Sequence, residues 1–159
     1  MMRYVRAAMG ALLVGALLAA GYYYAAYYQQ PVPTKVTQAT VRIGSTTLPV
    51  LLALTPIDRQ RGLSGRAALA KNQGMLFVFD APGRWGFWMK DMYFPIDIIW
   101  LDAAARVVTV AHNVSPQSYP EVLHPTQPSL YVLELAAGES RKLGIVEGQQ
   151  LQIEGVVAQ

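Results

Sequence analysis

The sequence lacks cysteine altogether and has only two histidines. Without cysteine, the chain has no disulfides, no catalytic thiolate and no cysteine-ligated zinc site. His112 and His124 show no His-x-His or His-x₃-His spacing, and no glycine-rich phosphate loop is present. Neither a metal nor another cofactor is therefore expected. A serine hydrolase is also unsupported, because no serine lies in a Gly-x-Ser-x-Gly elbow.

Charge is scarce as well, since charged residues make up 14% of the 159 residues and hydrophobic residues 53%. Residues 7–34 carry no charge at all. Of the 13 basic residues, Arg3 and Arg6 precede this stretch, which leaves 11 basic against 10 acidic residues in the body that follows. The charge of the body is nearly balanced and no dense Lys/Arg cluster is present, so binding to nucleic acid is not expected.

The uncharged N-terminal stretch is typical of a membrane segment. It is apolar at first and then contains five tyrosines, a residue favoured at the membrane–water boundary. About 20 apolar residues suffice to cross the hydrocarbon core, so residues 5–28 predict an anchor. Because Arg3 and Arg6 lie on its first side, the body is expected outside the cytoplasm, on the periplasmic or extracellular side. A cleavable signal peptide with Ala7–Ala20 as its apolar core is the alternative, and it also exports the body.

The chain divides into residues 1–28 as the anchor or signal segment, residues 29–35 as a linker and residues 36–159 as one β domain. Two prolines at alternate positions disfavour helix in the linker. In the body, short apolar runs separated by glycine and proline predict strands near 36–43, 48–54, 74–79, 85–90, 96–101, 106–112, 130–135 and 150–157. The run 96–101 is apolar on both faces, which predicts burial on both sides.

No ten-residue helical period separates consecutive strands, so a parallel βαβ sheet is disfavoured. The expected fold class is mainly β: an antiparallel β-sandwich or barrel-like domain with one or two short helices, preceded by the N-terminal hydrophobic helix. Thr55-Pro56-Ile57-Asp58 is a helix start, in which threonine caps and proline takes the first helical position, and Gly62 ends this helix. A second helical turn is expected over 138–143, with Gly144 following its end.

Five blocks of the body resemble a known family. They are Arg59–Arg66, Gly74–Phe79, Phe87–Lys90, Pro95–Asp97 and Tyr131–Leu135, the last followed by Gly138, Gly144-Ile145 and Gly148. Their order and spacing, over about residues 47–155, are similar to those of the bacterial and archaeal family called domain of unknown function 192. The resemblance implies a compact, mostly β domain that is often exported behind a signal or an anchor. It implies no reaction.

Two positions depart from the family pattern. Ser64-Gly65 lies where the family usually has methionine followed by a large apolar residue, and Asp91-Met92 lies where it usually has Asn-Thr. If that Asn-Thr pair contributes polar contacts to a site, this chain has an altered site.

Asp97 is the first candidate site residue. It alternates with Ile99 and Leu101, so its carboxylate is expected in the core, where it needs a cation or several N–H donors. Arg66 is the first expected partner and Lys90 the second. A structural ion pair or backbone contact is favoured over a catalytic carboxylate.

Trp88 and Lys90 are the second candidate, because they share one face of their run while Phe87 and Met89 share the other. Trp88 could form a stacking platform for a sugar or another flat ligand, or it could pack under a loop. Arg66 and Lys90 could bind an anionic ligand, or they could be solvated surface charges. Glu134 is expected to be an edge carboxylate or the partner of a basic residue.

Three functional hypotheses follow. The first is a non-catalytic binding or accessory domain, tethered to the membrane through residues 5–28, which takes a small carbohydrate or anionic ligand. It is favoured because the sequence offers no nucleophile–base pair. The second is an envelope hydrolase or transferase that uses Asp97 with Arg66 or Lys90. The third is a structural or assembly partner that uses the proline-rich segment 116–128.

Overall fold

The computed structural model describes residues 19, 21–24 and 39–156. The chain splits into two compact units, Met1–Lys35 and Val36–Gln159. Most of the expected anchor, residues 5–28, and the whole linker lie outside the described residues, although residues 21–24 are helical. Within the part of the chain that is described, no helix has the length and apolar character needed to cross a membrane.

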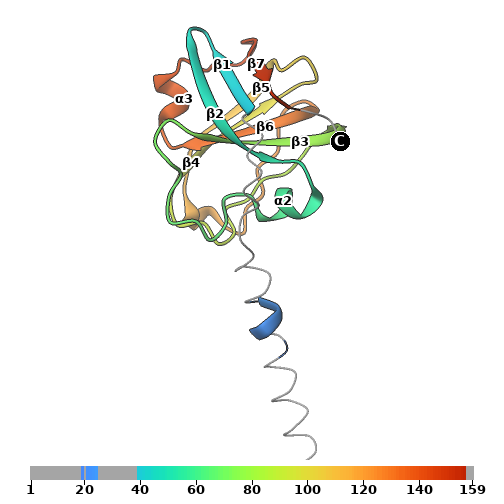
Figure 1. The fold of residues 1–159 in the computed structure, drawn as a ribbon, viewed down its shortest axis with the longest axis vertical. Helices are drawn as coiled ribbons and strands as arrows, with labels where there is room; N and C mark the ends of the chain where they lie inside the picture. The colour runs from blue at the N-terminus through green and yellow to red at the C-terminus, as the bar shows by residue number, and fades with distance from the viewer. Residues whose placement is uncertain (1–18, 20, 25–38, 157–159) are drawn as a thin grey trace, which may run out of the picture. The chain divides into compact units, whose positions relative to one another are not determined.

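The second unit is built on one mixed β-sheet (Figure 1). Its seven strands are β1 (Ala39–Ile43), β2 (Thr46–Ala53), β3 (Gly74–Gly83), β4 (Ile96–Leu101), β5 (Val107–Val114), β6 (Ser129–Ala136) and β7 (Gln152–Glu154). Their order across the sheet is β5-β4-β6-β3-β2-β1-β7. Two short α-helices, α2 (Pro56–Arg61) and α3 (Glu139–Lys142), and a 3₁₀ turn at Pro116–Ser118 complete the fold.

The mainly β class is confirmed, but the expected antiparallel sandwich or barrel-like arrangement is wrong in detail. The sheet is open and mixed, because β2 and β3 pair in parallel. Residues 54–73 make the crossover between them, and only the short α2 within this segment is helical. A largely irregular segment therefore connects the two parallel strands, where a βαβ unit has a long helix. Because this segment has no helical period, the parallel pairing could not be predicted from the sequence.

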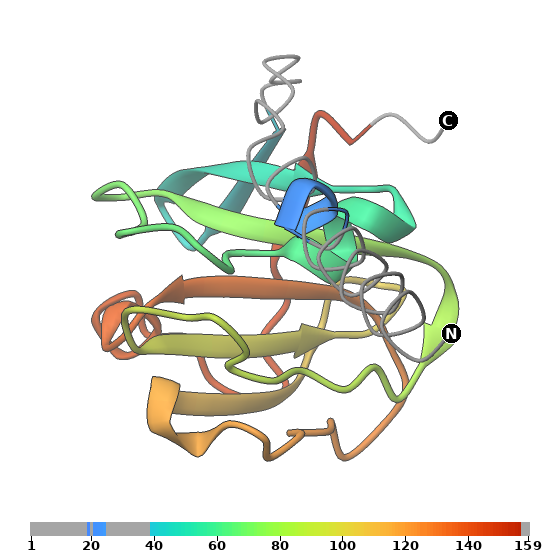
Figure 2. The same cartoon turned by 90° about the horizontal axis from the view of Figure 1, so that it is seen from below.

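The sheet curls, as Figure 2 shows. The segment before β7, at one edge, hydrogen-bonds the start of β5, at the other edge. The Val107 amide donates to the Gln149 carbonyl at 2.9 Å, and the Leu151 amide donates to the Ala105 carbonyl at 3.0 Å. The curl covers one face of the central strands and connecting segments cover the other, and all six residues of β4 are buried, as predicted.

Each face of the sheet has its own apolar cluster. One cluster includes Leu76, Ile99 and Leu133, together with β1 and β2 residues. The other is on the opposite face and is covered by the connecting segments, whose buried members are Leu63, Phe87, Met89 and Met92. Phe77, Phe87, Ile98 and Leu133 are buried in these clusters, whereas Phe79 is only half-buried.

The strand expected over 85–90 is absent. Phe87 makes only an isolated bridge with Leu123. The expected alternation is nevertheless present, because Phe87 and Met89 are buried while Trp88 and Lys90 are exposed. The alternating pattern reports which side chains face the core, and it does not require a neighbouring ladder.

The sequence predicted the α2 cap correctly. The Thr55 side chain accepts a hydrogen bond from the Asp58 amide at 3.2 Å. Gly62 ends the helix with φ of +49°, and a Cβ there would lie 3.1 Å from the Phe77 ring. The turn at α3 is also as predicted, since Gly144 follows its last residues with φ of +66°.

Asp97 is buried at a corner between β4, the end of β5 and α3. Its carboxylate accepts hydrogen bonds from the Asn113 amide at 2.7 Å, the Ser140 amide at 3.0 Å and the Ser140 hydroxyl at 2.7 Å. The prediction that Arg66 or Lys90 is the partner of Asp97 is wrong. Two backbone N–H groups and the Ser140 hydroxyl bind the carboxylate instead. Burial raises the pKa of Asp97, but these hydrogen bonds outweigh it and hold the pKa below the usual 3.8.

Asp97→Asn should destabilise the fold by roughly 1–3 kcal/mol at neutral pH. The reason is that the asparagine NH₂ group, a donor, would replace a carboxylate oxygen that accepts hydrogen bonds. The contribution of Asp97 is present above its ordinary pKa of 3.8 and should disappear as pH falls through its lowered native pKa. Urea unfolding measures both effects. Asp80→Asn, at a carboxylate that is 92% exposed, is the control and should change stability by about 0.5 kcal/mol or less. Equal stability of Asp97→Asn and Asp80→Asn would contradict the structural role.

Candidate functional site

A pocket of about 210 Å³ lies on the sheet face that the connecting segments cover. Four parts of the chain form it: the end of α2 with the turn after it, β3, the segment 85–92 and β6. The lining residues are Arg59, Gln60, Arg61, Gly62, Leu63, Ser64, Phe77, Phe79, Trp85, Gly86, Phe87, Trp88, Met92 and Glu134. Residues from four of the five blocks that carry the family resemblance thus converge on one pocket.

Five of the lining residues are aromatic. Phe79 stacks on Trp85 with centroids 4.2 Å apart, and Phe77 meets Phe87 edge to face at 4.8 Å. Trp85 and Trp88 are 36% and 49% exposed, so the pocket reaches solvent beside them. The rings hold one another in fixed orientations, which gives the pocket rigid, flat walls.

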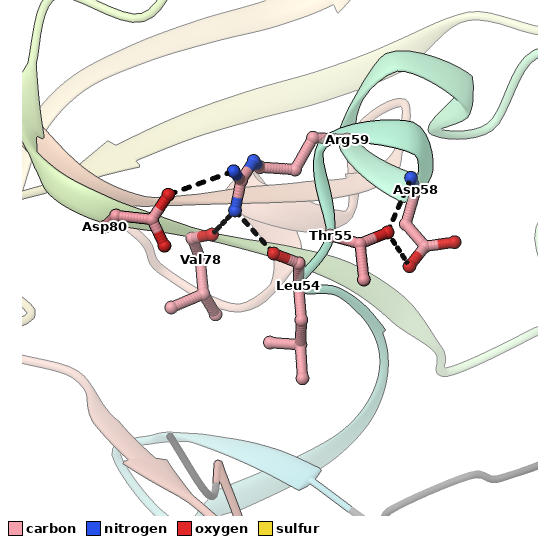
Figure 3. A network of polar contacts seen from close by, with 6 residues as sticks. All are labelled: Leu54, Thr55, Asp58, Arg59, Val78 and Asp80. Carbon is pink, nitrogen blue, oxygen red and sulfur yellow. Dashed lines mark hydrogen bonds and ion pairs between the residues drawn. The ribbon is translucent and has the colours of Figure 1, made fainter. Parts of the chain in front are cut away.

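Arg59 fastens α2 to the end of the parallel strand pair (Figure 3). Its Nη1 donates to the carbonyls of Leu54 and Val78, which follow the last paired residues of β2 and β3. Its Nη2 pairs with Asp80 at 3.2 Å, and its guanidinium lies 5.2 Å from the centre of the Phe79 ring. Arg59 therefore satisfies two carbonyls that the ladder leaves open and fixes the position of the Arg61–Ser64 wall.

Glu134 provides the one acidic side chain among the described residues that line the pocket. It is 5% exposed, and its Oε2 has no hydrogen-bond partner among the described residues. Burial raises the pKa of Glu134 to about 8. At neutral pH the side chain is therefore a neutral carboxylic acid, a hydrogen-bond donor that faces a pocket.

The position of Glu134 follows from β6. Leu133 and Leu135 pack in the cluster on one face, so Val132 and Glu134 project to the other. Glu134 was expected at an edge or in an ion pair, and both expectations are wrong. β6 lies between β4 and β3, and no ion pair of the described residues includes Glu134.

Two residues of the 85–92 segment shape the pocket further. A Cβ on Gly86 would lie 2.6 Å from both the Val122 and the His124 side chains, so a larger residue there would require these side chains to move. Met92 is buried in the pocket wall at the position where the family pattern usually has threonine. Its thioether has no O–H or N–H to offer Glu134, so this departure leaves the pocket more apolar.

Of the four candidate site residues, the structure brings only Trp88 to this pocket. Lys90 is exposed, and its carbonyl accepts from the Ser64 hydroxyl at 2.8 Å. Arg66 is half-buried outside the pocket lining, and Asp97 projects to the opposite face of the sheet. Binding by Trp88, Lys90, Arg66 or Asp97 stays a prediction.

The pocket also contains residues that were not predicted as site residues from the sequence, among them Glu134, Arg61, Phe79 and Trp85. The available signal was a glutamate within the otherwise apolar run 130–135. Ser140 also gives no support for a nucleophile, because its hydroxyl is buried and bonds to Asp97. Among the residues that the structure describes, no group of three or more acidic or histidine side chains could hold a metal ion.

Glu134 should make the stability of the domain depend on pH. Its pKa is about 8 in the folded chain against an ordinary 4.5, so its favourable contribution is fully present below about 4.5 and is lost as pH rises to 8. The complete loss amounts to roughly 5 kcal/mol. Glu134→Gln cannot titrate, so its stability relative to wild type should rise by several kcal/mol between about pH 5 and about pH 8 in urea unfolding.

The control for this experiment is Glu154→Gln, which removes a half-exposed carboxylate that pairs with Arg42. It makes the same change of charge and should follow the wild-type pH profile. If Glu134→Gln also followed that profile, Glu134 would titrate normally and would not be desolvated.

Comparisons with known proteins agree with this architecture. No curated protein matches the chain. A solved structure from Sinorhizobium meliloti 1021, provisionally named a transcription regulator, is 31% identical, covers 74% of this chain and 93% of its own, and has a TM-score of 0.68. A protein of unknown function from Novosphingobium aromaticivorans is 33% identical over 72% of this chain and 82% of its own, with a TM-score of 0.64. The model of the DUF192 family, described as an uncharacterised family, matches residues 38–153. The chain therefore belongs to the DUF192 family, as its five sequence blocks indicated.

Proposed function

We propose that this domain binds a small organic ligand in the pocket around Glu134 and does not itself catalyse a reaction. The observation that carries the proposal is a buried carboxyl group whose Oε2 has no partner among the described residues and which faces a pocket walled by five aromatic rings. Leaving a buried polar atom unsatisfied costs about 1–3 kcal/mol, so a ligand that supplies the missing hydrogen bond gains this amount on binding.

The pocket limits the size of the ligand. An apolar cavity of about 150 Å³ accepts benzene, and this pocket measures about 210 Å³. A single ring with one or two small polar substituents fits this volume. Flat walls that end at Trp85 and Trp88 favour a planar ring or the flat face of a sugar ring. A small carbohydrate or a small anion, the ligand classes that the sequence suggested, both remain within these bounds.

The proposal places the domain in the cell envelope. Its support is the sequence of residues 1–28, where a basic flank, an apolar stretch and a tyrosine cluster follow one another as in an anchor or a signal segment. In this proposal the domain is tethered to the membrane or secreted, and it meets its ligand on the periplasmic or extracellular side.

The alternative of an envelope hydrolase or transferase receives less support. It requires Asp97 to face a substrate, whereas the carboxylate of Asp97 is buried and holds three donors of its own. No observation favours a role as an assembly partner. We extend no role in transcription from the Sinorhizobium meliloti 1021 protein, since the nearly balanced charge of the body offers no electrostatic footprint for nucleic acid.

Ligand binding should raise the melting temperature of the full chain in a concentration-dependent way. We expect this shift from at least one ring-sized compound in a thermal screen of envelope sugars, glycopeptide fragments and small ring acids. Trp88→Ala should reduce the shift, because Trp88 lines the pocket and its exposure makes the change tolerable for folding. Tyr93→Ala, at an aromatic residue that is 71% exposed and outside the pocket lining, is the matched control and should keep the shift. The absence of any shift across the screen, or its equal loss in both variants, would contradict the proposal.

Export predicts the activity of a fused reporter. A reporter joined after Gln159 should be active only if it is of the kind that works in the periplasm. Activity of a cytoplasm-only reporter at this position would overturn the envelope assignment. A mature N-terminus near Tyr22 would identify the segment as a cleaved signal, and an intact N-terminus would identify it as an anchor.

A further inference from the structure

We propose that the ligand of this pocket is a ring that carries a carboxylate, and that Glu134 binds this carboxylate as a hydrogen-bond donor. The inference rests on the proposed binding function and narrows it to one chemical class. It also gives Glu134 a definite role: the side chain takes part in binding in its acid form and not as an anion.

The charges around Glu134 favour an anion. The charged side chains that line the pocket with it are Arg59 and Arg61, both from the end of α2, and no other acidic side chain is among the described lining residues. Arg59 is engaged by two carbonyls and by Asp80. Arg61 adds a second guanidinium to the same wall. The ionised side chains in the lining are therefore basic, which favours a ligand of negative charge over one of positive charge.

The protonation state of Glu134 favours the same ligand. Burial raises the pKa of Glu134 to about 8, so the carboxyl group holds its proton at neutral pH. An O–H group that faces a pocket lacks an acceptor, and a carboxylate oxygen is a strong acceptor that makes short, charge-assisted hydrogen bonds. A cationic ligand, in contrast, would have to displace this proton and would lie beside two guanidinium groups.

The aromatic wall selects the rest of the ligand. Five aromatic side chains line the pocket, and two of them, Phe77 and Phe87, meet edge to face at 87°. A planar ring can pack against the face or the edge of an aromatic side chain. Because Met92 brings a thioether to the wall in place of a hydroxyl, the part of the ligand that lies beside it is apolar.

The linkage between ligand binding and the protonation of Glu134 determines how the affinity changes with pH. A carboxylate that binds only the acid form of Glu134 loses affinity as pH rises through the pKa of about 8. Its dissociation constant should be nearly constant below about pH 7 and should increase about tenfold by about pH 9. A ligand cation would show the opposite trend, because it binds the ionised form.

The test is titration calorimetry on the full chain with three probes of one shape: benzoate, benzyl alcohol and benzylammonium. We expect benzoate to bind at least about tenfold more tightly than benzylammonium at about pH 6 and to lose this affinity at about pH 9. Glu134→Gln keeps an N–H donor and cannot titrate, so it should bind benzoate with a nearly constant affinity over the same pH range.

Two arginine variants provide a matched pair that does not depend on Glu134→Gln being folded. Arg61→Gln removes a charge from the pocket wall and should weaken benzoate binding, whereas Arg66→Gln removes a charge outside the lining and should not. Each variant is first compared with wild type by thermal melting.

The outcomes separate the inference from the proposed function. Tighter binding of benzylammonium or benzyl alcohol would overturn the carboxylate inference while the pocket remains a binding site. A pH-independent affinity of wild type for benzoate would also overturn it. Failure of all three probes to bind would count against the inference and the proposed function together, and a ligand found only in the sugar screen would overturn the inference alone.

Discussion

Burial of both faces of the central strands is the constraint on which the rest of this structure depends. The open sheet curls until the segment before β7 hydrogen-bonds the start of β5, and the connecting segments cover the face that the curl leaves open. A buried ionisable side chain on β4 or β6 must then either form hydrogen bonds or ion pairs or become neutral. Asp97 and Glu134 are the two buried carboxyl groups of these strands, one on each face, and they meet the constraint in opposite ways.

The contrast between these two carboxyl groups distinguishes a structural role for Asp97 from a binding role for Glu134. Asp97 has three hydrogen-bond donors, which lower its pKa, and it pins the corner where β4, β5 and α3 meet. Glu134 has a pKa of about 8 and faces a pocket. A satisfied buried carboxylate stabilises the fold on its own, whereas an unsatisfied one costs stability that a ligand can restore. Arg59 connects the sheet to the pocket. It donates to two carbonyls at the end of the parallel strand pair and thereby positions the pocket wall.

Local features of this fold could be predicted from the sequence, and long-range ones could not. Neighbouring residues determine the cap at Thr55 and the turn at Gly144. The pattern of apolar residues along the strand determines the two-sided burial of β4. The parallel pairing of β2 with β3 depends on the irregular crossover 54–73, which has no such period. The need of Asp97 for donors was predictable from its burial, but their identity depends on where the ends of β5 and α3 meet. For Glu134, alternation along β6 gives the face, and only the fold reveals that this face is covered.

The role proposed for the pocket requires Glu134 to be a buried carboxylic acid that keeps its proton at neutral pH. Its most direct test is the titration of the Glu134 side-chain carboxyl carbon by ¹³C NMR, assigned by comparison with Glu134→Gln. A midpoint of about 8 agrees with this account. A midpoint near the ordinary value of 4.5 would mean that water or a protein group stabilises the ionised side chain, and it would contradict this account.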